Sequence, residues 1–521
     1  MTQDLPEVEA RIGKINSSLD TNGYSTEKKE VSKLRVAFPQ VCAVSAKNLL
    51  LLTFGTTLGF STILLPALQK ENPDVAVTRE EITWISSINL FMVPLGCIIS
   101  GPISHYLGRK RTMLIANIPF ITAWIILYFA TSAPYIFMAL ALTGLTGGLC
   151  EAPVLTYVAE VTQPHLRGML SATASMAVIV GVFTQLLTGS LTDWRTVALI
   201  NLTYPVMCFV ALCMMPESPY WLAGKDRLED AEKSLCWLRG WVKPSQVREE
   251  FATVCQVVKR PLDNEEKQSC WRIFGKKTFI SPFILVSLSF FVATFGGTAT
   301  LQTFAVYIFA RMEAPLNKYT ATVFLGIAEI IGTAVCVFAI HFTGKRKITF
   351  ASISGTGVCF LGSAVYGYLI QFEFIDGVNY TWIPTALLIG AAFFSHMGIK
   401  LLPWILCGEV FPSKGRSTAT GAAATTAYIF SSVANKIFLY MVDLMSLLGT
   451  FLFYASVNIA GYIALYYLLP ETEGRTLKEI EDHYAGIQSL NSKPNKDKSV
   501  SKEKWAASNP GLVVDDYESK L

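Results

Sequence analysis

Four ionisable side chains lie within stretches of sequence that are otherwise apolar: Glu151, Glu329, His396 and Lys400. A lone charge at the centre of a bilayer costs about 2.5–3.5 kcal/mol even on the insertion scale, so such side chains normally face the protein interior, paired or in contact with water. Glu329 and Lys400 have opposite charges, and we expect them to pair with each other or to bind a solute. The alternative is that Lys400 extends alone toward an aqueous vestibule while Glu329 is protonated.

Hydroxyl and amide groups mark one face of a predicted helix between residues 279 and 310. Thr294, Thr298 and Gln302 follow an i, i+4, i+8 pattern, which places them on the same face. Gly296 and Gly297 beside them permit a close approach or a local unwinding of the helix. We expect these polar groups to contact a solute. Alternatively, the two threonines donate to carbonyl groups of their own helix.

Three charged motifs occur twice in the same order along the chain. The copies are separated by similar distances in sequence, 236 positions (341 − 105), 249 (409 − 160) and 254 (470 − 216). The pairs are His105–Arg111 with His341–Lys347, Glu160 and Arg167 with Glu409 and Arg416, and Pro216-Glu217-Ser218 with Pro470-Glu471-Thr472. Repetition in one register indicates a duplicated helical bundle, which is the organisation of alternating-access carriers.

The elements that must position these residues are twelve apolar stretches, each long enough to cross a bilayer. Of the 521 residues, 52% are hydrophobic and only 16% are charged, against about 25% in soluble proteins. The sequence therefore predicts an all-α membrane protein with twelve transmembrane helices in two pseudo-symmetric six-helix halves. The predicted spans are 41–68, 82–104, 113–131, 135–158, 168–190, 195–215, 279–310, 318–342, 349–371, 381–408, 418–442 and 446–469.

The spans divide the chain into five segments. These are an N-terminal tail (1–40), a first half (41–215), a polar central loop with short helices (216–278), a second half (279–469) and a C-terminal tail (470–521). Basic residues concentrate in the loops on one side of the spans, and this side is predicted to be cytosolic. Both tails and the central loop lie on the same side, so we expect both termini in the cytosol and the protein in the cell membrane.

Several function classes find no support in the sequence. The net charge is only +4, which gives no reason to expect nucleic-acid binding. We expect no metal and no cofactor, because no metal-ligand spacing, catalytic triad or phosphate-binding loop occurs. Asn379-Tyr380-Thr381 is a glycosylation sequon in a loop on the predicted outer side, so Asn379 can carry a glycan. The expected partners are a small solute and the lipid bilayer, and protein partners are unknown.

The motifs resemble those of the sugar porter family of the major facilitator superfamily, and within it the facilitated trehalose transporter-like branch of insects. The resemblance covers about residues 40–485. It rests on Gly101–Arg111, Glu160–Gly168, Pro216–Leu222, Pro403-Trp404 with Glu409-Val410-Phe411, and Pro470–Leu477.

The resemblance implies a cytosolic gate made of acidic and basic residues at the inner ends of the helices. In the family these groups pair when the protein faces outward and separate when it opens inward. Exposed pairs are worth roughly 0–1 kcal/mol each, so they can be broken in every cycle. The alternative is that the charges only set the topology. The matching residues here are Arg109, Glu160, Arg167, Glu217, Lys345, Glu409, Arg416 and Glu471.

The family's sugar site combines amide side chains with an aromatic floor, and this chain departs from it. Trp404 matches the floor tryptophan, although a tryptophan at the membrane interface is the alternative reading. Most of the family's amide positions hold other residues here, namely Ser175, Ala293, Thr294, Ala299, Glu329 and Ala427 followed by Tyr428. The candidate binding residues are therefore Ser175, Thr294, Thr298, Gln302, Glu329, His396, Lys400, Trp404 and Tyr428.

The resemblance implies a carrier, not an enzyme, that moves trehalose or a hexose by alternating access. Proton-driven members usually carry an aspartate in the first span, whereas this chain has Gly59-Phe60-Ser61-Thr62 there. A facilitative uniporter is therefore expected, with Glu151 and Glu329 as alternative proton carriers. Because the amides are lost and charges are gained, a carrier of a charged or non-sugar solute and a solute sensor that does not transport remain as alternatives.

Overall fold

The computed structural model describes residues 32–70, 73–259, 277–372, 381–411, 416–473, 475, 477–487 and 490, and all regular structure in these ranges is helical. The long helices of the first half are α2 (Lys33–Leu68), α4 (Ile88–Leu107), α5 (Arg109–Phe129), α6 (Ala133–Val161), α7 (Pro164–Leu191) and α9 (Thr203–Met214). Shorter helices of this half and of the central segment are α3 (Arg79–Ile85), α8 (Trp194–Asn201), α10 (Pro219–Gly224), α11 (Leu228–Leu238) and α12 (Pro244–Lys259).

The second half is built in the same way, with more interruptions. It comprises α14 (Lys277–Phe295), α15 (Thr298–Thr303), α16 (Ala305–Arg311), α17 (Lys318–Thr343), α18 (Lys345–Gln371), α19 (Trp382–His396), α20 (Leu402–Glu409) and α21 (Arg416–Leu468), followed by α22 (Leu477–Tyr484).

The described helices form twelve membrane spans in two halves of six, which confirms the predicted fold class. Ten segments are individually long and apolar enough to cross a membrane. One of these ten, α21, contains two spans joined at Ser446, where φ is +67°, and α19 with α20 forms the twelfth span. The first helix begins at Lys33, before the predicted span, because hydropathy marks only its apolar part. Its first turn is fixed by Arg35, whose Nε donates to the Gly240 carbonyl oxygen at 3.1 Å.

The seventh span is broken between α14 and α15. Gly297 has a φ of +95°, and a Cβ atom placed there would lie 2.5 Å from Tyr454 Cδ2, so no residue with a side chain fits without a shift. Asn458 Nδ2 donates to the Gly296 carbonyl oxygen at 3.0 Å. The side chain of Asn458 thus satisfies a backbone group that the interrupted helix leaves free.

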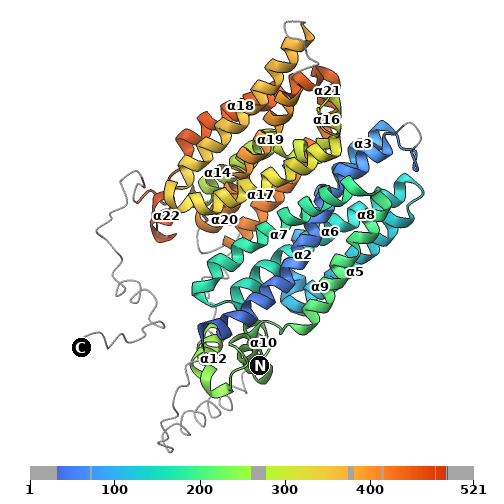
Figure 1. Cartoon of the computed structure of the whole chain (residues 1–521). Coiled ribbons are helices and arrows are strands. Elements are labelled where there is room, and N and C mark those ends of the chain that lie inside the picture. The colour runs from blue at the N-terminus through green and yellow to red at the C-terminus, as the bar shows by residue number, and fades with distance from the viewer. Residues whose placement is uncertain are drawn as a thin grey trace, which may run out of the picture.

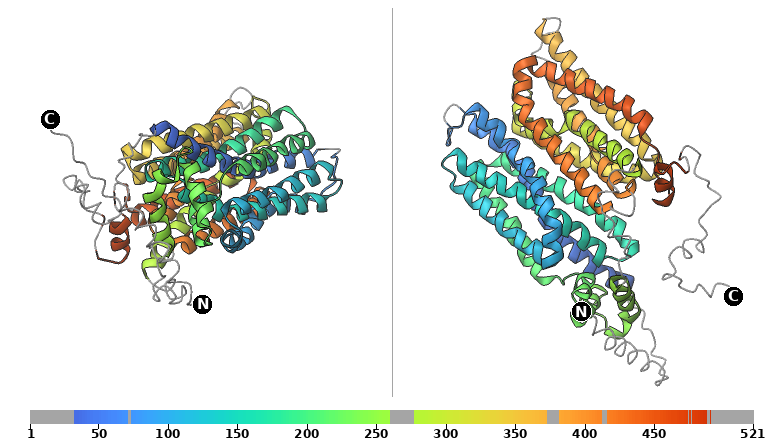
Figure 2. Two further views of the ribbon diagram at one scale, coloured as in Figure 1. Left: turned by 90° about the horizontal axis from the view of Figure 1, so that it is seen from below. Right: turned by 180° about the vertical axis from the view of Figure 1, so that it is seen from behind.

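The two halves share one apolar core only at one end of the bundle. We call the end that carries α10, α12 and α22 the lower end, and the end that carries α3 the upper end (Figure 1). A single cluster of buried side chains at the upper end contains residues of both halves, such as Phe60 and Trp124 of the first and Phe309 and Phe438 of the second. Toward the lower end, each half has its own cluster of buried side chains, and Tyr428 of the second half packs against the cluster of the first. Figure 2 shows the two bundles side by side from behind, with α10–α12 and α22 at the same end.

Candidate functional site

Gln302 and Glu329 lie together within the second half. Gln302, on the short helix α15, donates from Nε2 to Glu329 Oε2 on α17 at 3.1 Å. Glu329 is only 2% exposed, so this amide replaces part of the hydration that the carboxylate loses on burial. The break at Gly297 interrupts the span one turn before Gln302, and it positions α15 independently of α14.

Lys400 and His396 lie at a second break, between α19 and α20. The Lys400 ammonium acts electrostatically on the Glu329 carboxylate. No ion pair within 4 Å joins them, although the structure describes both side chains. His396 is buried, and its Nδ1 lies 3.0 Å from the Ala392 carbonyl oxygen. If Nδ1 carries the proton and donates to this oxygen, Nε2 is left as a hydrogen-bond acceptor.

Aromatic side chains from three spans meet at Trp404. Trp404, on α20, packs edge-on against Phe290 of α14, with ring centroids 5.0 Å apart. Its indole also contacts Tyr428 of α21 at a centroid distance of 6.1 Å. Lys400 precedes Trp404 by four residues, so the aromatic group and the charged group adjoin along the chain. Trp404 therefore lies in the helix bundle, where an aromatic face can stack on an apolar ring.

The hydroxyl residues that were expected to contact a solute are less available for such contacts. Thr294 and Thr298 are both buried, and the Thr298 hydroxyl donates to the Ala293 carbonyl oxygen at 2.6 Å. This bond crosses the break from α15 to the last turn of α14. Because the helix is interrupted at Gly296 and Gly297, the i, i+4, i+8 relation with Gln302 does not hold along one continuous helix. Ser175 is exposed on α7.

At the lower end of the first half, charged residues join the helices of that half to the central segment. Arg109 donates from Nε and Nη2 to the two oxygens of Glu160 at 3.0 and 2.9 Å. The Glu217 carboxylate accepts from the backbone N–H groups of Arg109 and Lys110 at 3.0–3.1 Å, and so caps the N-terminus of α5. Ser218 donates its hydroxyl to Glu160. Together these bonds tie α5, α6 and the start of α10.

The second half repeats this arrangement residue by residue. Lys345 Nζ lies 2.6 Å from Glu409 Oε1 and 2.9 Å from Glu473 Oε2. Glu471 caps α18 by accepting from the N–H groups of Lys345 and Arg346 at 3.1 and 3.0 Å. Thr472 donates its hydroxyl to Glu409 at 2.8 Å. The sequence repeat is therefore also a structural repeat.

Each of these ion pairs lies within one half and does not cross between halves. Arg109–Glu160 and Lys345–Glu409 are formed here even though the halves are joined at the upper end. Arg167 is exposed, and its Nη2 donates to the Thr162 carbonyl oxygen at 3.3 Å. The Arg416 side chain and Asn379 lie outside the described residues.

The upper end is where side chains of the two halves bond to each other. Lys436 Nζ, on α21, donates to Thr83 Oγ1 at 2.7 Å and lies 4.0 Å from the centroid of the Trp84 ring. Asn435 Nδ2 donates to the Ser86 carbonyl oxygen at 3.2 Å. Further contacts are made by Arg79 with Asp443, Ser432 with the Ser87 carbonyl, and Thr62 with the Gln302 carbonyl. In the described part of the chain, this geometry holds the upper end closed.

A family model described as "Sugar (and other) transporter" matches residues 41–484. The chain belongs to this family. Over 460 residues, the chain is 27% identical to the facilitated trehalose transporter Tret1 of Bombyx mori. The alignment covers 88% of this chain and 90% of the relative. The chain is 26% identical to Tret1 of Culex quinquefasciatus, covering 92% of each. The family consists of transporters, so the chain is a multi-pass membrane carrier and not an enzyme.

Solved structures support the same fold. The chain matches the xylose transporter XylE from E. coli in a partially occluded inward open conformation, with a TM-score of 0.67, 16% identity and coverage of 84% of this chain and 99% of XylE. An inward open structure of XylE matches with a TM-score of 0.66 and 18% identity, covering 84% and 98%. At such identities the match establishes the major facilitator fold.

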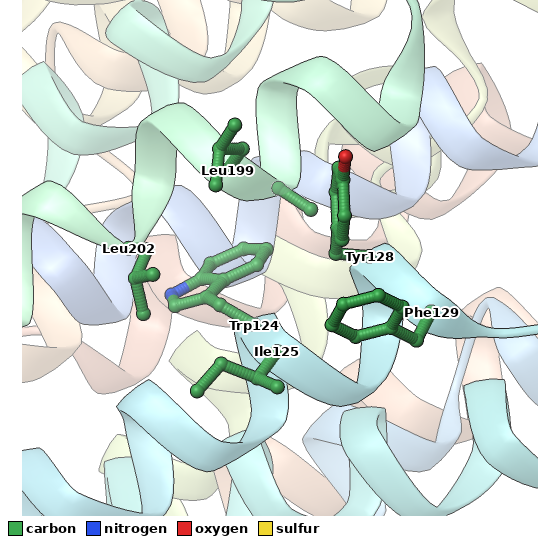
Figure 3. A pocket seen from close by; sticks show the side chains of 7 residues that line it. Trp124, Ile125, Tyr128, Phe129, Leu199 and Leu202 are labelled. Carbon is green, nitrogen blue, oxygen red and sulfur yellow. The ribbon is translucent and has the colours of Figure 1, made fainter.

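A pocket near the upper end of this transporter is separate from the polar group described above. It has a volume of about 150 Å³ and lies between α5 and α8 (Figure 3). Its lining is almost entirely apolar and consists of Trp124, Ile125, Tyr128, Phe129, Ala198, Leu199 and Leu202. Ile125, Phe129 and Leu199 are exposed on the outside of the helix bundle, so the pocket faces the lipid.

Sequence reasoning missed the contacts at the upper end and the hydroxyl groups at the lower end. Lys436 lies within the predicted span 418–442, but its partner Thr83 is 353 positions away, and no sequence pattern connects the two residues. Ser218 and Thr472 end the two copies of the repeated Pro-Glu-Ser/Thr motif, so that repeat could have identified them. Glu473 follows the second copy of that motif and pairs with Lys345.

Proposed function

We propose that the protein is a facilitative sugar transporter that moves trehalose or a hexose across the cell membrane by alternating access. The observation that carries the proposal is the hydrogen bond from Gln302, at the broken seventh span, to the buried Glu329 on α17, with Lys400 acting on the same carboxylate from the break between α19 and α20. Broken helices in the middle of a membrane span are typical of substrate sites in carriers. The trehalose transporters of insects are its relatives over most of the chain.

The polar residues provide both kinds of hydrogen-bonding group that a sugar needs. Lys400 supplies hydrogen-bond donors, and Glu329 and His396 Nε2 supply acceptors. The side-chain oxygen Oε1 of Gln302 is a further acceptor, because Nε2 of the same amide already donates to Glu329. The Trp404 indole supplies an apolar face for the sugar ring. Charged side chains thus supply the hydrogen-bonding groups that amides supply elsewhere in the family. The opposite charges of Glu329 and Lys400 cancel, so this part of the site is neutral.

The distribution of basic residues supports a cytosolic lower end. Arg109, Lys110, Arg111, Lys345 and Arg346 all lie there, and cytosolic loops are enriched in lysine and arginine. Helix α2 begins at this end and α22 lies there. With the lower end in the cytosol, the closed upper end makes this the inward-facing arrangement, and the sequon at Asn379 lies outside the cell.

The two types of contact have different roles in the proposed cycle. The upper contacts join the halves, so they must break when the carrier opens to the outside. The lower ion pairs hold helices within one half, so each half can move as a rigid body while Arg109–Glu160 and Lys345–Glu409 persist. The halves then rock about the central site and expose it to one side at a time.

Uptake by purified protein in liposomes tests the proposal. Saturable uptake of labelled trehalose or glucose without any ion gradient is the expected result. Gln302→Ala removes the amide bonded to Glu329 and should reduce uptake at least tenfold, because it leaves the buried carboxylate without its hydrogen bond. Glu229→Gln on the exposed face of α11 is the control and should transport normally. Absence of sugar uptake by folded protein would overturn the proposal.

A further inference from the structure

The hydrogen-bond ladder of α6 is interrupted next to Glu151, an acid that the proposed sugar site does not use. Pro153 has no N–H group, so it cannot donate to the Leu149 carbonyl oxygen. Ser100, on the neighbouring helix α4, donates its hydroxyl to that oxygen at 2.6 Å and accepts from the Ala152 N–H at 3.0 Å. A side chain of α4 therefore stabilises an irregular turn in the middle of the span, and Glu151 belongs to this turn.

Glu151 lies in the first half, near residues of the second half that include Tyr428 of the aromatic group. Its carboxylate acts electrostatically on Tyr428 and Cys407 of the second half and on Cys97 of α4. The packing agrees, because Tyr428 packs against the lower cluster of the first half, which includes Cys150 and Val154 on either side of Glu151. Tyr428 in turn contacts Trp404. The first half thus contributes a carboxylate near Tyr428, which links it to the aromatic group of the second half.

No basic side chain neutralises this carboxylate in the described part of the chain. Glu329 has Gln302 and Lys400, whereas the groups that face Glu151 from α4, α20 and α21 are Cys97, Cys407 and Tyr428. Glu151 forms no ion pair and no hydrogen bond within the residues that the structure describes. A single negative charge in the membrane interior is costly and calls for a counter-charge.

We propose that Glu151 is a cation-recognition residue, and that the carrier binds amino sugars through it. A protonated amine on a sugar would lie between the Glu151 carboxylate and the ring faces of Tyr428 and Trp404. An unpaired carboxylate combined with aromatic rings is the combination that binds organic ammonium groups, by charge and by cation–π attraction. A neutral hydroxyl at the same place would leave the negative charge uncompensated. The inference rests on the proposed sugar site, and it adds the class of substrate that this site prefers.

Two pairs of sugars that differ only by one hydroxyl or ammonium group test the proposal. Competition against labelled trehalose or glucose uptake in liposomes, at a pH where the amines are protonated, compares glucosamine with glucose and trehalosamine with trehalose. We expect the amino member of at least one pair to inhibit at a concentration tenfold or more below its neutral counterpart. Glu151→Gln should abolish this preference, so that the amino sugar and its neutral counterpart inhibit at similar concentrations. Glu229→Gln is the control and should keep the preference.

The outcomes separate this inference from the proposed function. If neutral sugars are transported but the wild type shows no preference for the amine, or if Glu151→Gln keeps the preference, Glu151 is not a cation-recognition residue. A requirement for a proton gradient in the uptake of neutral sugar, lost in Glu151→Gln, would also overturn the inference, because the counter-charge would then be a proton. If no neutral sugar is transported at all, it is the sugar-transport proposal that fails.

Discussion

Removing the Lys436 ammonium should make the upper end open more readily. Lys436 links the halves by a hydrogen bond of 2.7 Å to Thr83 Oγ1 and by its position 4.0 Å from the centroid of the Trp84 ring. A hydrogen bond from a charged group contributes about 1.5–3 kcal/mol and a cation–π contact about 0.5–1 kcal/mol. Water that solvates the freed partners offsets part of this sum. We therefore expect Lys436→Ala to weaken the closed state by about 1–2 kcal/mol, which is roughly a 5–30-fold shift in the conformational equilibrium.

Labelling of a cysteine at the upper interface measures this shift. Ser432 is 4% exposed and contacts the Ser87 carbonyl, so Ser432→Cys should react slowly with a membrane-impermeant maleimide added from outside. Adding Lys436→Ala should raise the labelling rate roughly 5–30-fold. Lys318→Ala, which removes a lysine at the same end that lies over the Tyr319 ring, is the matched control and should leave the rate unchanged. An unchanged or slower rate in the Lys436→Ala background would refute the reasoning.

Three further predictions concern stability, measured as thermal unfolding of the detergent-purified protein. Gly297→Ala places a Cβ atom on a backbone with φ of +95° and against Tyr454, so it should destabilise the fold by about 1–3 kcal/mol. The control is Gly421→Ala, where a Cβ atom meets no other atom, and it should not lower the unfolding temperature. Glu217→Gln removes the charge that caps α5 and should cost about 1–2 kcal/mol, and an unchanged unfolding temperature would argue against the cap. Asp193 caps α8, and the hydrogen bond from the Thr196 hydroxyl lowers the pKa of Asp193 below its usual value. Its contribution is therefore present above the pKa of the unfolded state and is lost as the pH falls through the folded pKa, so the loss of stability in Asp193→Ala, about 0.5–2 kcal/mol at neutral pH, should disappear in acid.

Much of the fold could be predicted because the sequence signals are physical requirements of the membrane. Apolar length identified the spans, and the duplicated charged motifs showed that the halves are related. The caps formed by Glu217 and Glu471 explain why those motifs repeat, since each holds the N-terminus of a helix that follows a glycine. Gly296 and Gly297 were expected to permit a close approach or a local unwinding, and the seventh span is interrupted there. These features depend on neighbouring residues along the chain, so one sequence is enough to reveal them.

The site was harder to predict because its contacts join distant segments. The pattern of Thr294, Thr298 and Gln302 assumed one continuous helix, and the break at Gly297 changes how these residues relate. The bond between Gln302 and Glu329 spans 27 positions, and nothing in the sequence specified it. Lys436 and Thr83 are further apart still. Long-range packing determines such pairs, and the spacing of residues does not reveal it.

The most direct test of the central claim is counterflow in liposomes that contain the purified protein. Vesicles loaded with unlabelled trehalose or glucose are diluted into a trace of the same labelled sugar, without a gradient of protons or other ions. A facilitative alternating-access carrier should accumulate the label transiently above its equilibrium level, because exchange through one site couples the outward and inward movements of sugar. If the label never exceeds equilibrium for either sugar, while the protein is folded and correctly inserted, the account of a facilitative sugar carrier is contradicted.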